Sequence, residues 1–164
     1  MDNQFVKIFN LYKNDIYRLA YSYTRNKADA DDITQKTFIK LHKNLDQIAS
    51  NEDNIRKWCF KVAINECKDL FLSAWKRKMF PITNKEENQA ITIKNNDSVL
   101  DDALELLSKK DRLIIHLYYY EDCKVSDIAS FLNIKVGAVK TRLSRARKEL
   151  KKILKENFED EEKI

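Results

Sequence analysis

The sequence predicts an all-α fold made of two small helical domains, and three observations support this prediction. The chain has one Gly and one Pro in 164 residues, too few for the many turns of a β architecture. Apolar residues recur at helical spacing through the N-terminal half and again through the C-terminal third. With 43% hydrophobic residues the chain can fill helical cores, which excludes disorder throughout.

The first domain is predicted at residues 1–80 as a helical bundle. The apolar pattern is nearly continuous from residue 5 to about residue 78, with separate stripes on successive helices. The first stripe consists of Phe5, Ile8, Phe9, Tyr12, Ile16 and Leu19. The next consists of Ile33, Phe38, Leu41 and Leu45.

A flexible linker is predicted at residues 81–97, where helical periodicity stops. This segment starts at the single Pro and gathers Asn, Thr and charged residues. The second domain is predicted at residues 98–158, where the stripe resumes at Leu100, Leu104, Leu107, Leu113, Ile114 and Leu117. Residues 159–164 begin with four consecutive acids and are predicted to form a frayed, solvent-facing tail.

Within the second domain, residues 125–148 predict a helix-turn-helix. In its first helix Ile128, Ala129 and Leu132 are spaced to bury one face, and the small Ala129 allows a second helix to approach closely. Asn133 marks the turn between the two helices.

The second helix of this motif has an apolar stripe and an opposite cationic face. The stripe consists of Val139, Leu143, Ala146 and Leu150. Helical spacing turns the other face outward, with Lys140, Thr141, Ser144, Arg145 and Lys148. Such a face is suited to the major groove of DNA.

The side chains of this helix suit distinct contacts with DNA. Arg145 can fork onto the acceptors of a guanine, and Thr141 and Ser144 can donate or accept hydrogen bonds. Contacts with phosphates suit Arg142, Arg147 and Lys148. Two simpler interpretations stay open: Gly137 either lets backbone amides approach a phosphate or only starts the helix, and the segment could be a solvated basic helix.

The charge distribution predicts a polyanionic partner. The formal net charge is +5, and nine of the cations lie between Lys135 and Lys155, where Glu149 is the one acid. A second basic cluster runs from Arg56 to Lys78. Cations concentrated in this way are typical of proteins that bind nucleic acids.

The sequence predicts neither an enzyme nor a metal or cofactor site. His42 and His116 lie 74 residues apart, without a nucleophile–base spacing or a Gly-rich phosphate loop. The cysteines form no zinc pattern and are expected to be buried thiols in a reducing interior: Cys59, Cys67 and Cys123. We find no export leader and no membrane-spanning apolar run, so a cytoplasmic location without membrane insertion is expected.

Three motifs occur in order along the chain. They are ADADDITQKTFIKLHKNL at residues 28–45, RKWCFKVAINECKDL at residues 56–70 and VGAVKTRLSRARKEL at residues 136–150. Together they resemble the bacterial RNA polymerase sigma factors of the extracytoplasmic-function (ECF) group of the sigma-70 family. The resemblance covers nearly the whole chain and implies a non-catalytic subunit that binds core polymerase, directs it to promoters and assists promoter melting.

In this family the first motif docks on the β′ clamp of polymerase. The resemblance therefore implies core polymerase binding by Asp31, Asp32, Gln35 and Phe38. Carboxylates and an amide can meet basic side chains across an interface, and an aromatic ring can anchor it. Lys36 departs from the acidic residue often found at its place, and by itself the segment is an ordinary amphipathic helix.

The second motif resembles the segment that recognises and melts the minus ten promoter element. Matching positions are Trp58, Lys61, Asn65 and Asp69. Helical geometry independently places on one exposed arc Lys57, Lys61, Asn65 and Lys68. The opposite arc, toward a core, holds Cys59, Ala63 and Leu70. In the family a flipped base enters a pocket built partly by the preceding loop, here residues 46–55. A core position remains the alternative for Trp58.

The third motif resembles the domain that binds the minus thirty-five element. The resemblance implies that the bases of this element are contacted by Lys140, Thr141, Ser144 and Arg145. It also implies that Arg142 and Arg147 contact the DNA backbone or anchor the helix. The resemblance also implies that residues 147–152 sit on the β flap of polymerase. It further implies an anti-sigma factor, often membrane-anchored in the family, that clamps both domains.

Two other functions stay open on the residues alone. One is a stand-alone helix-turn-helix regulator whose N-terminal bundle senses or dimerises, and a stable complex with core polymerase would exclude it. The other is a helical adaptor that offers its basic faces to an acidic protein. Salt-sensitive promoter binding that requires polymerase would exclude the adaptor.

Overall fold

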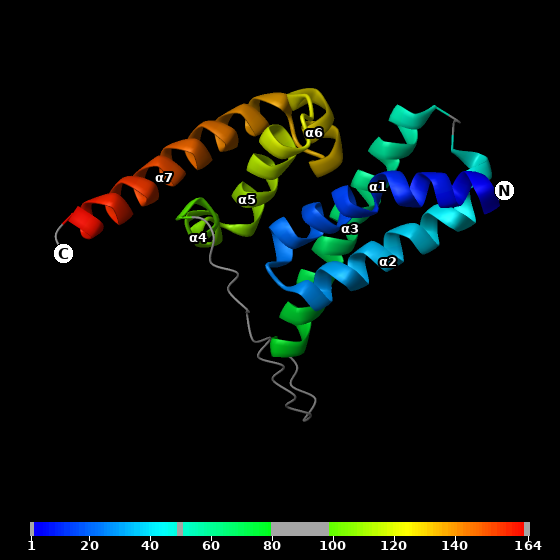
Figure 1. Cartoon of the computed structure of the whole chain (residues 1–164), viewed down its shortest axis with the longest axis horizontal. Coiled ribbons are helices and arrows are strands. Elements are labelled where there is room, and N and C mark those ends of the chain that lie inside the picture. The colour runs from blue at the N-terminus through cyan, green and yellow to red at the C-terminus, as the bar shows by residue number, and fades with distance from the viewer. Residues whose placement is uncertain (1, 49–50, 80–98, 163–164) are drawn as a thin grey trace. The chain divides into compact units, whose positions relative to one another are not determined.

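The computed structural model describes residues 2–48, 51–79 and 99–162, and the regular structure within these ranges is helical (Figure 1). The elements are α1 (Asp2–Thr24), α2 (Lys27–Asn44), the 3₁₀ turn η1 (Leu45–Gln47), α3 (Glu52–Met79), α4 (Val99–Leu106), α5 (Lys109–Ile115), the π-helical η2 (His116–Tyr120), α6 (Val125–Leu132) and α7 (Val136–Glu162). The chain divides into two compact units, Met1–Thr92 and Ile93–Ile164. The predicted all-α fold is confirmed, and the predicted linker at 81–97 lies outside the described residues.

In the first unit, α1 and α2 form an antiparallel pair joined by a two-residue turn. Arg25 adopts a left-handed conformation, with φ of 50°, that ends α1. Asn26 caps the next helix, because its side-chain oxygen accepts a hydrogen bond from the Asp29 backbone N–H at 2.9 Å. The tight turn therefore holds α2 directly against α1.

The third helix, α3, packs on both partners and completes the core of this unit. The largest side chains buried at this junction are Ile16, Leu19, Ile33, Leu41, Phe60 and Ile64. Both predicted stripes thus contribute to the core, although Phe5 and Phe9 stay partly exposed. The final turns of α3, residues 71–79, are exposed throughout and extend beyond α1 and α2 (Figure 1).

In the second unit, α4, α5 and α6 pack against α7 around a separate core. This core contains Leu113, Ile114, Leu117, Ile128 and Val139. A buried polar pair closes the connection from η2 to α6: His116 Nε2 lies 3.1 Å from Glu121 Oε1. Asp122 follows with a φ of 50°, and the Cys123 N–H donates to the Leu117 carbonyl at 2.9 Å.

Two segments are more helical than the sequence predicted. The acidic residues 159–162 continue α7 to Glu162, since no Gly or Pro follows Gly137 and Lys, Leu and Glu favour helix. The loop expected at residues 46–55 is also shorter, because η1 extends to Gln47 and α3 already begins at Glu52.

The three cysteines are buried and free, as predicted. Burial raises the pKa of Cys59 to about 12. Burial, together with the neighbouring Glu66 carboxylate, raises the pKa of Cys67 to about 12. Both side chains are fully inaccessible and line the contact of α3 with the rest of its unit.

We expect Cys59 and Cys67 to resist Ellman's reagent in the native protein at pH 8 and to react fully in guanidinium chloride. A raised pKa keeps the native thiols protonated, so their stabilising contribution is complete below the ordinary value of 9.0 and is lost as the pH rises toward 12. The Cys59→Ala and Cys67→Ala variants assign the signals. Rapid labelling of either thiol in the native protein would contradict this burial.

Candidate functional site: three exposed helix faces

The first candidate face lies on α2. Asp31, Asp32 and Gln35 are exposed there, as the predicted polymerase contact requires. The opposite side of α2 is buried, with Ala30, Ile33, Thr37, Phe38 and Leu41. The Thr37 hydroxyl donates to the Ile33 carbonyl at 2.8 Å, which satisfies this polar group inside the core.

Phe38 borders this face, about 20° around the helix from Asp31, but its side chain is buried, and its predicted contact with polymerase stays a prediction. Its side chain is 4% exposed and packs edge-on against the Phe9 ring, with centroids 4.8 Å apart. The signal was present in the sequence, because Phe38 also belongs to the apolar stripe. The apolar residue that α2 presents is its neighbour Ile39, 55% exposed and one turn beyond Gln35.

Lys36 changes the charge of this face. Its Nζ lies 2.9 Å from Asp32 Oδ2 in an ion pair that is half exposed on both sides. The hydrogen bond to Asp32, and then the charge of that carboxylate, raise the pKa of Lys36. A second ion pair, Lys40 with the largely buried Glu66, ties α2 to α3.

The second candidate face lies on α3. Lys61, Asn65 and Asp69 are exposed, and the flanking Lys57 and Lys68 are partly exposed. The opposite arc is buried at Cys59, Ala63, Ile64 and Cys67. Lys57 also pairs with Asp53 one turn earlier at 2.9 Å. The arc predicted from helical geometry is therefore present on one side of the helix.

Two residues of α3 differ from their expected positions. Trp58 is only partly buried, so it is neither a core aromatic nor a free surface residue. Leu70 was expected in the core but is also only partly buried. Its position follows from the length of α3, because this helix leaves the bundle within the next turn.

The third candidate face depends on the helix-turn-helix of α6 and α7. Asn133 ends α6 with φ 53° and ψ 47°, a left-handed conformation that Asn tolerates. The Ile134 N–H then donates to the Ala129 carbonyl at 3.0 Å, which closes the turn. Ile128 and Ala129 are buried as predicted, whereas Phe131 takes the place in the core expected for Leu132.

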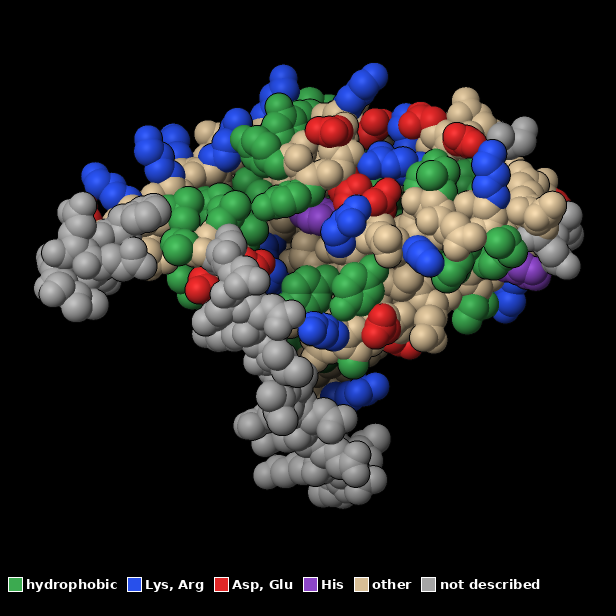
Figure 2. Space-filling view, in the orientation of Figure 1, with side chains coloured by type: hydrophobic (Ala, Val, Ile, Leu, Met, Phe, Trp, Pro, Cys, Tyr) green, Lys and Arg blue, Asp and Glu red, His purple; other side chains and the backbone are tan. Residues whose placement is uncertain are grey.

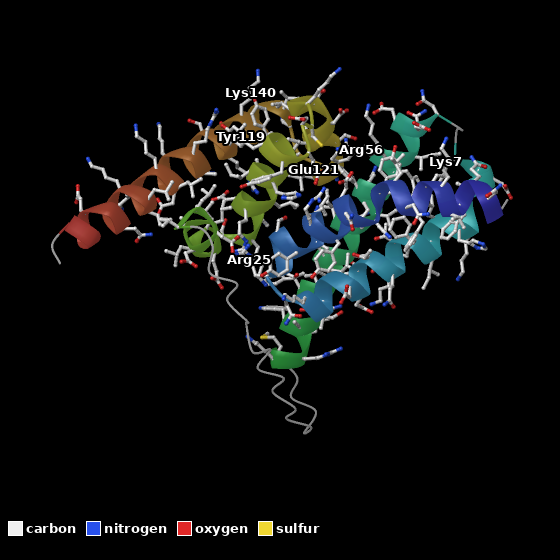
Figure 3. The ribbon with its side chains drawn as sticks, viewed as in Figure 1. Lys7, Arg25, Arg56, Tyr119, Glu121 and Lys140 are labelled. Atoms are coloured by element: carbon white, nitrogen blue, oxygen red, sulfur yellow. The ribbon has the colours of Figure 1, made fainter. Side chains whose placement is uncertain are left out.

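On α7, the predicted outer face is exposed. Lys140, Thr141, Arg145 and Lys148 are open to solvent, and Arg142 and Ser144 are partly so. Figure 2 shows Lys and Arg side chains along the outer side of α7, and Figure 3 shows Lys140 pointing away from the helix bundle. The opposite stripe is buried at Val139, Leu143 and Ala146. Neither backbone strain nor packing within the described residues requires glycine at position 137.

Two side chains of α7, those of Thr141 and Arg147, form hydrogen bonds within the chain. The Thr141 hydroxyl donates to the Gly137 carbonyl at 2.9 Å, which leaves its oxygen available as an acceptor. Arg147 Nη1 donates to the Tyr119 hydroxyl at 3.2 Å. Arg147 lies seven residues after Lys140, about 20° around the helix, so it borders the predicted DNA face while its guanidinium is held by Tyr119. Of the predicted roles for Arg147, the geometry favours anchoring the helix.

The second unit also contains an apolar groove that the sequence did not predict. A cavity of about 430 Å³ opens between α4, the α5–η2 segment and α7, with Tyr119 at its side (Figure 3). It is lined by Leu100, Leu104, Ile115, Tyr119, Tyr120, Arg147, Leu150, Lys151 and Leu154. The leucines at i, i+4 spacing on α4 and α7 were the available signal, but their convergence depends on tertiary packing.

The described residues contain no group of three or more His, Cys, Asp or Glu side chains able to hold a metal ion. Within the same part of the chain, no helix combines the length and apolarity needed to cross a bilayer. The described residues present charged helix faces and an apolar groove.

The fold and these faces define a two-unit helical protein with a helix-turn-helix in its second unit. Residues 8–77 match the family model "Sigma-70 region 2", and residues 98–150 match "Sigma-70, region 4". The chain is 33% identical to the RNA polymerase sigma factor SigV of Bacillus subtilis (strain 168), covering 84% of this chain and 82% of SigV. It is 31% identical to the ECF RNA polymerase sigma factor SigW of the same organism, covering 93% and 89%.

Solved structures share the fold. The sigma factor RpoE, crystallised with the anti-sigma factor NepR from Bartonella quintana, matches with a TM-score of 0.77 and 24% identity, covering 92% of this chain and 96% of RpoE. CnrH, in complex with the cytosolic domain of CnrY, matches with a TM-score of 0.66 and 21% identity, covering 94% and 90%. The chain belongs to the sigma-70 family, in its ECF group. It is a sigma factor, a regulatory protein that directs RNA polymerase to promoters.

Proposed function

We propose that the three helix faces divide the work of promoter selection. The α2 face binds core polymerase, the α3 face holds the minus ten element and the α7 face reads the minus thirty-five element. The observation that carries this assignment is the position of each face opposite a buried stripe, inside a matched sigma-70 region. Each stripe fixes the rotation of its helix, so the opposite face is presented as a rigid surface.

On α2, Asp31, Asp32 and Gln35 meet basic side chains of the β′ clamp, and Ile39 supplies the apolar anchor first assigned to Phe38. Half-exposed Ile39 can lose its remaining contact with water at an interface, whereas buried Phe38 has almost none left to lose. The Asp32–Lys36 ion pair must open or reorient for Asp32 to engage a new cation.

On α3, the cations follow the phosphates of the melted strand while neighbouring polar side chains contact bases. Lys57, Lys61 and Lys68 supply the charge, and Asn65 offers both a donor and an acceptor. Asp69 can accept from the amino group of a cytosine. Trp58 is open enough to border a flipped base while keeping part of its ring in the unit.

On α7, Arg145 reads a guanine, Lys140 and Ser144 contact neighbouring base edges, and Thr141 accepts a hydrogen bond. The acceptor role of Thr141 follows from its bond to the Gly137 carbonyl. Phosphates are held by Arg142, Lys148 and the amides near Gly137. Arg147 supports this face indirectly by tying α7 to Tyr119.

The groove between α4, η2 and α7 is the docking surface for the β flap of polymerase. It is apolar inside, and Arg147 and Lys151 from the run first assigned to the flap lie in its lining. An amphipathic segment with acidic flanks would satisfy both the apolar lining and these cations.

An anti-sigma factor would act by covering these polymerase-binding faces. RpoE and CnrH were each solved in a complex, RpoE with the anti-sigma factor NepR and CnrH with the cytosolic domain of CnrY. We place the protein in the cytoplasm, where polymerase and promoters are found, and an anti-sigma factor anchored in the membrane could hold it there until released. In this scheme the protein itself catalyses no reaction.

Run-off transcription with core polymerase on a genomic library tests the proposed function and maps both promoter elements. We expect discrete start sites that require the protein, and selection of those promoters at physiological salt. A chain that binds promoter DNA without polymerase and never supports initiation would instead be a stand-alone regulator. No initiation above core polymerase alone would refute the proposal.

We predict that Lys36→Glu tightens binding to core polymerase by about 2- to 5-fold, the scale of one exposed ion pair. The change removes the cation that pairs with Asp32 and adds a carboxylate to a face that meets basic side chains. Fluorescence titration with labelled protein measures the affinity. Lys110→Glu is the matched control, because it makes the same charge change at an exposed residue of the other unit.

Arg145→Ala and Lys148→Ala should weaken promoter binding in different ways. We expect Arg145→Ala to relax the preference at one upstream base by about 1–3 kcal/mol, because a bidentate guanine contact is lost. Lys148→Ala should weaken all sequences evenly and reduce the salt dependence of binding by about one phosphate contact. Competition binding of polymerase holoenzyme to promoters randomised in the minus thirty-five element measures both. If both variants changed the base preference equally, the assignment of Arg145 to a base and Lys148 to a phosphate would be wrong.

A further inference from the structure

One row of side chains runs along the whole exposed side of α3, and its second half has no assigned role. The row consists of Lys61, Asn65, Lys68, Leu72, Trp75 and Met79. Its spacings of four, three, four, three and four residues keep all six side chains on one arc of the helix. The first half is polar and belongs to the minus ten face, whereas the second half is apolar.

The apolar half of the row is open to solvent. Leu72 is 51% exposed, Trp75 is 52% exposed and Met79 is 56% exposed. All three lie on the final turns of α3, which extend beyond α1 and α2 (Figure 1). Three large apolar side chains in register on a surface helix mark an interaction site more often than chance exposure.

The charge around these residues restricts the kind of partner. Lys76 and Lys78 are exposed on either side of this apolar row, Arg77 is exposed on the opposite side of the helix, and Asp69 is the one acid between residues 68 and 79. A basic protein surface would be repelled by this cluster. An anionic partner would be attracted, and exposed aromatic faces among cations are the combination that binds unpaired nucleotides.

We propose that the end of α3 binds single-stranded promoter DNA, with Trp75 stacking on an unpaired base. Met79 covers one edge of this base, and Lys76 and Lys78, which flank the row, hold the phosphates. This inference rests on the proposed minus ten role of the same helix. Trp75 lies about 15 Å along the axis from Asn65, so one strand can follow both halves of the row.

Stacking by Trp75 would affect transcription initiation differently from the base-specific contacts of the other faces. Stacking tolerates any base, because every base presents a π face. Trp75 therefore acts as a positioning residue that holds the melted strand without selecting its sequence. Loss of Trp75 should destabilise the open promoter complex and leave the choice of promoter unchanged.

The test uses full-length protein with core polymerase, and its probe is a fluorescein-labelled, single-stranded oligonucleotide. The oligonucleotide carries the non-template sequence of a promoter mapped by run-off transcription. We expect Trp75→Leu to weaken binding about 5- to 100-fold, on the scale of one lost base–aromatic stack, and Trp75→Phe to recover much of it. Permanganate footprints on the full promoter should lose intensity in parallel for Trp75→Leu, with an unchanged start site.

A lysine substitution separates a nucleic acid from a protein or membrane partner. Leu72→Lys keeps or tightens binding to the oligonucleotide, because it adds a cation beside the strand, whereas it would disrupt apolar docking. Leu11→Lys is the matched control, since Leu11 is also 51% exposed but lies on α1. Circular dichroism confirms that each variant folds.

Three outcomes would overturn the inference. One is wild-type oligonucleotide affinity in Trp75→Leu. Another is loss of core polymerase binding in Leu72→Lys with Leu11→Lys unaffected, which would make the row a protein-docking surface. The third is binding to anionic phosphatidylglycerol vesicles that depends on Trp75 while oligonucleotide binding does not. Wild-type protein that never initiates transcription would instead refute the proposed function, so the two failures are distinguishable.

Discussion

The burial of one apolar stripe on each helix decides which residues this protein can offer to a partner. On α3, the small side chains of Cys59, Ala63 and Cys67 allow close packing, and this packing sets the rotation of the helix. Burying a large apolar side chain contributes about 1.5–3 kcal/mol, whereas an exposed ion pair contributes about 0–1 kcal/mol. The core therefore determines the orientation, and the charged faces follow from it.

The cations of the two units differ in how far neighbouring acids neutralise them. In the first unit, Lys36 and Lys57 each pair with an aspartate one turn earlier. Such exposed pairs are weak and can be exchanged for a partner's charge at little cost. On α7, eight cations between residues 136 and 155 share one acid, so a concentrated positive field can attract DNA from a distance. The first arrangement favours selective docking, and the second favours rapid capture.

The sequence was sufficient for the features that depend on local periodicity. Repeats of 3.6 residues identified the buried arcs of α1, α2, α3 and α7, and Asn133 marked the turn that it forms. Features that depend on tertiary contact were missed. Arg147 is drawn to Tyr119, 28 residues earlier, and the groove forms only where α4, η2 and α7 converge. Phe38 and Ile39 show a related limit, because residues 100° apart both border an apolar arc and packing decides which one is buried.

Two surfaces that each bind DNA weakly can bind a promoter tightly when one chain carries both. Each proposed DNA-binding face consists of a few side chains on a single helix, so each alone would support limited affinity. Linking them in one chain, and to the same polymerase, makes the second contact effectively intramolecular, at a local concentration that short linkers raise to the millimolar range. The faces need not be strong individually, and weak faces have an advantage here. A polymerase that has begun transcription must leave the promoter, and contacts of modest strength can be broken one at a time.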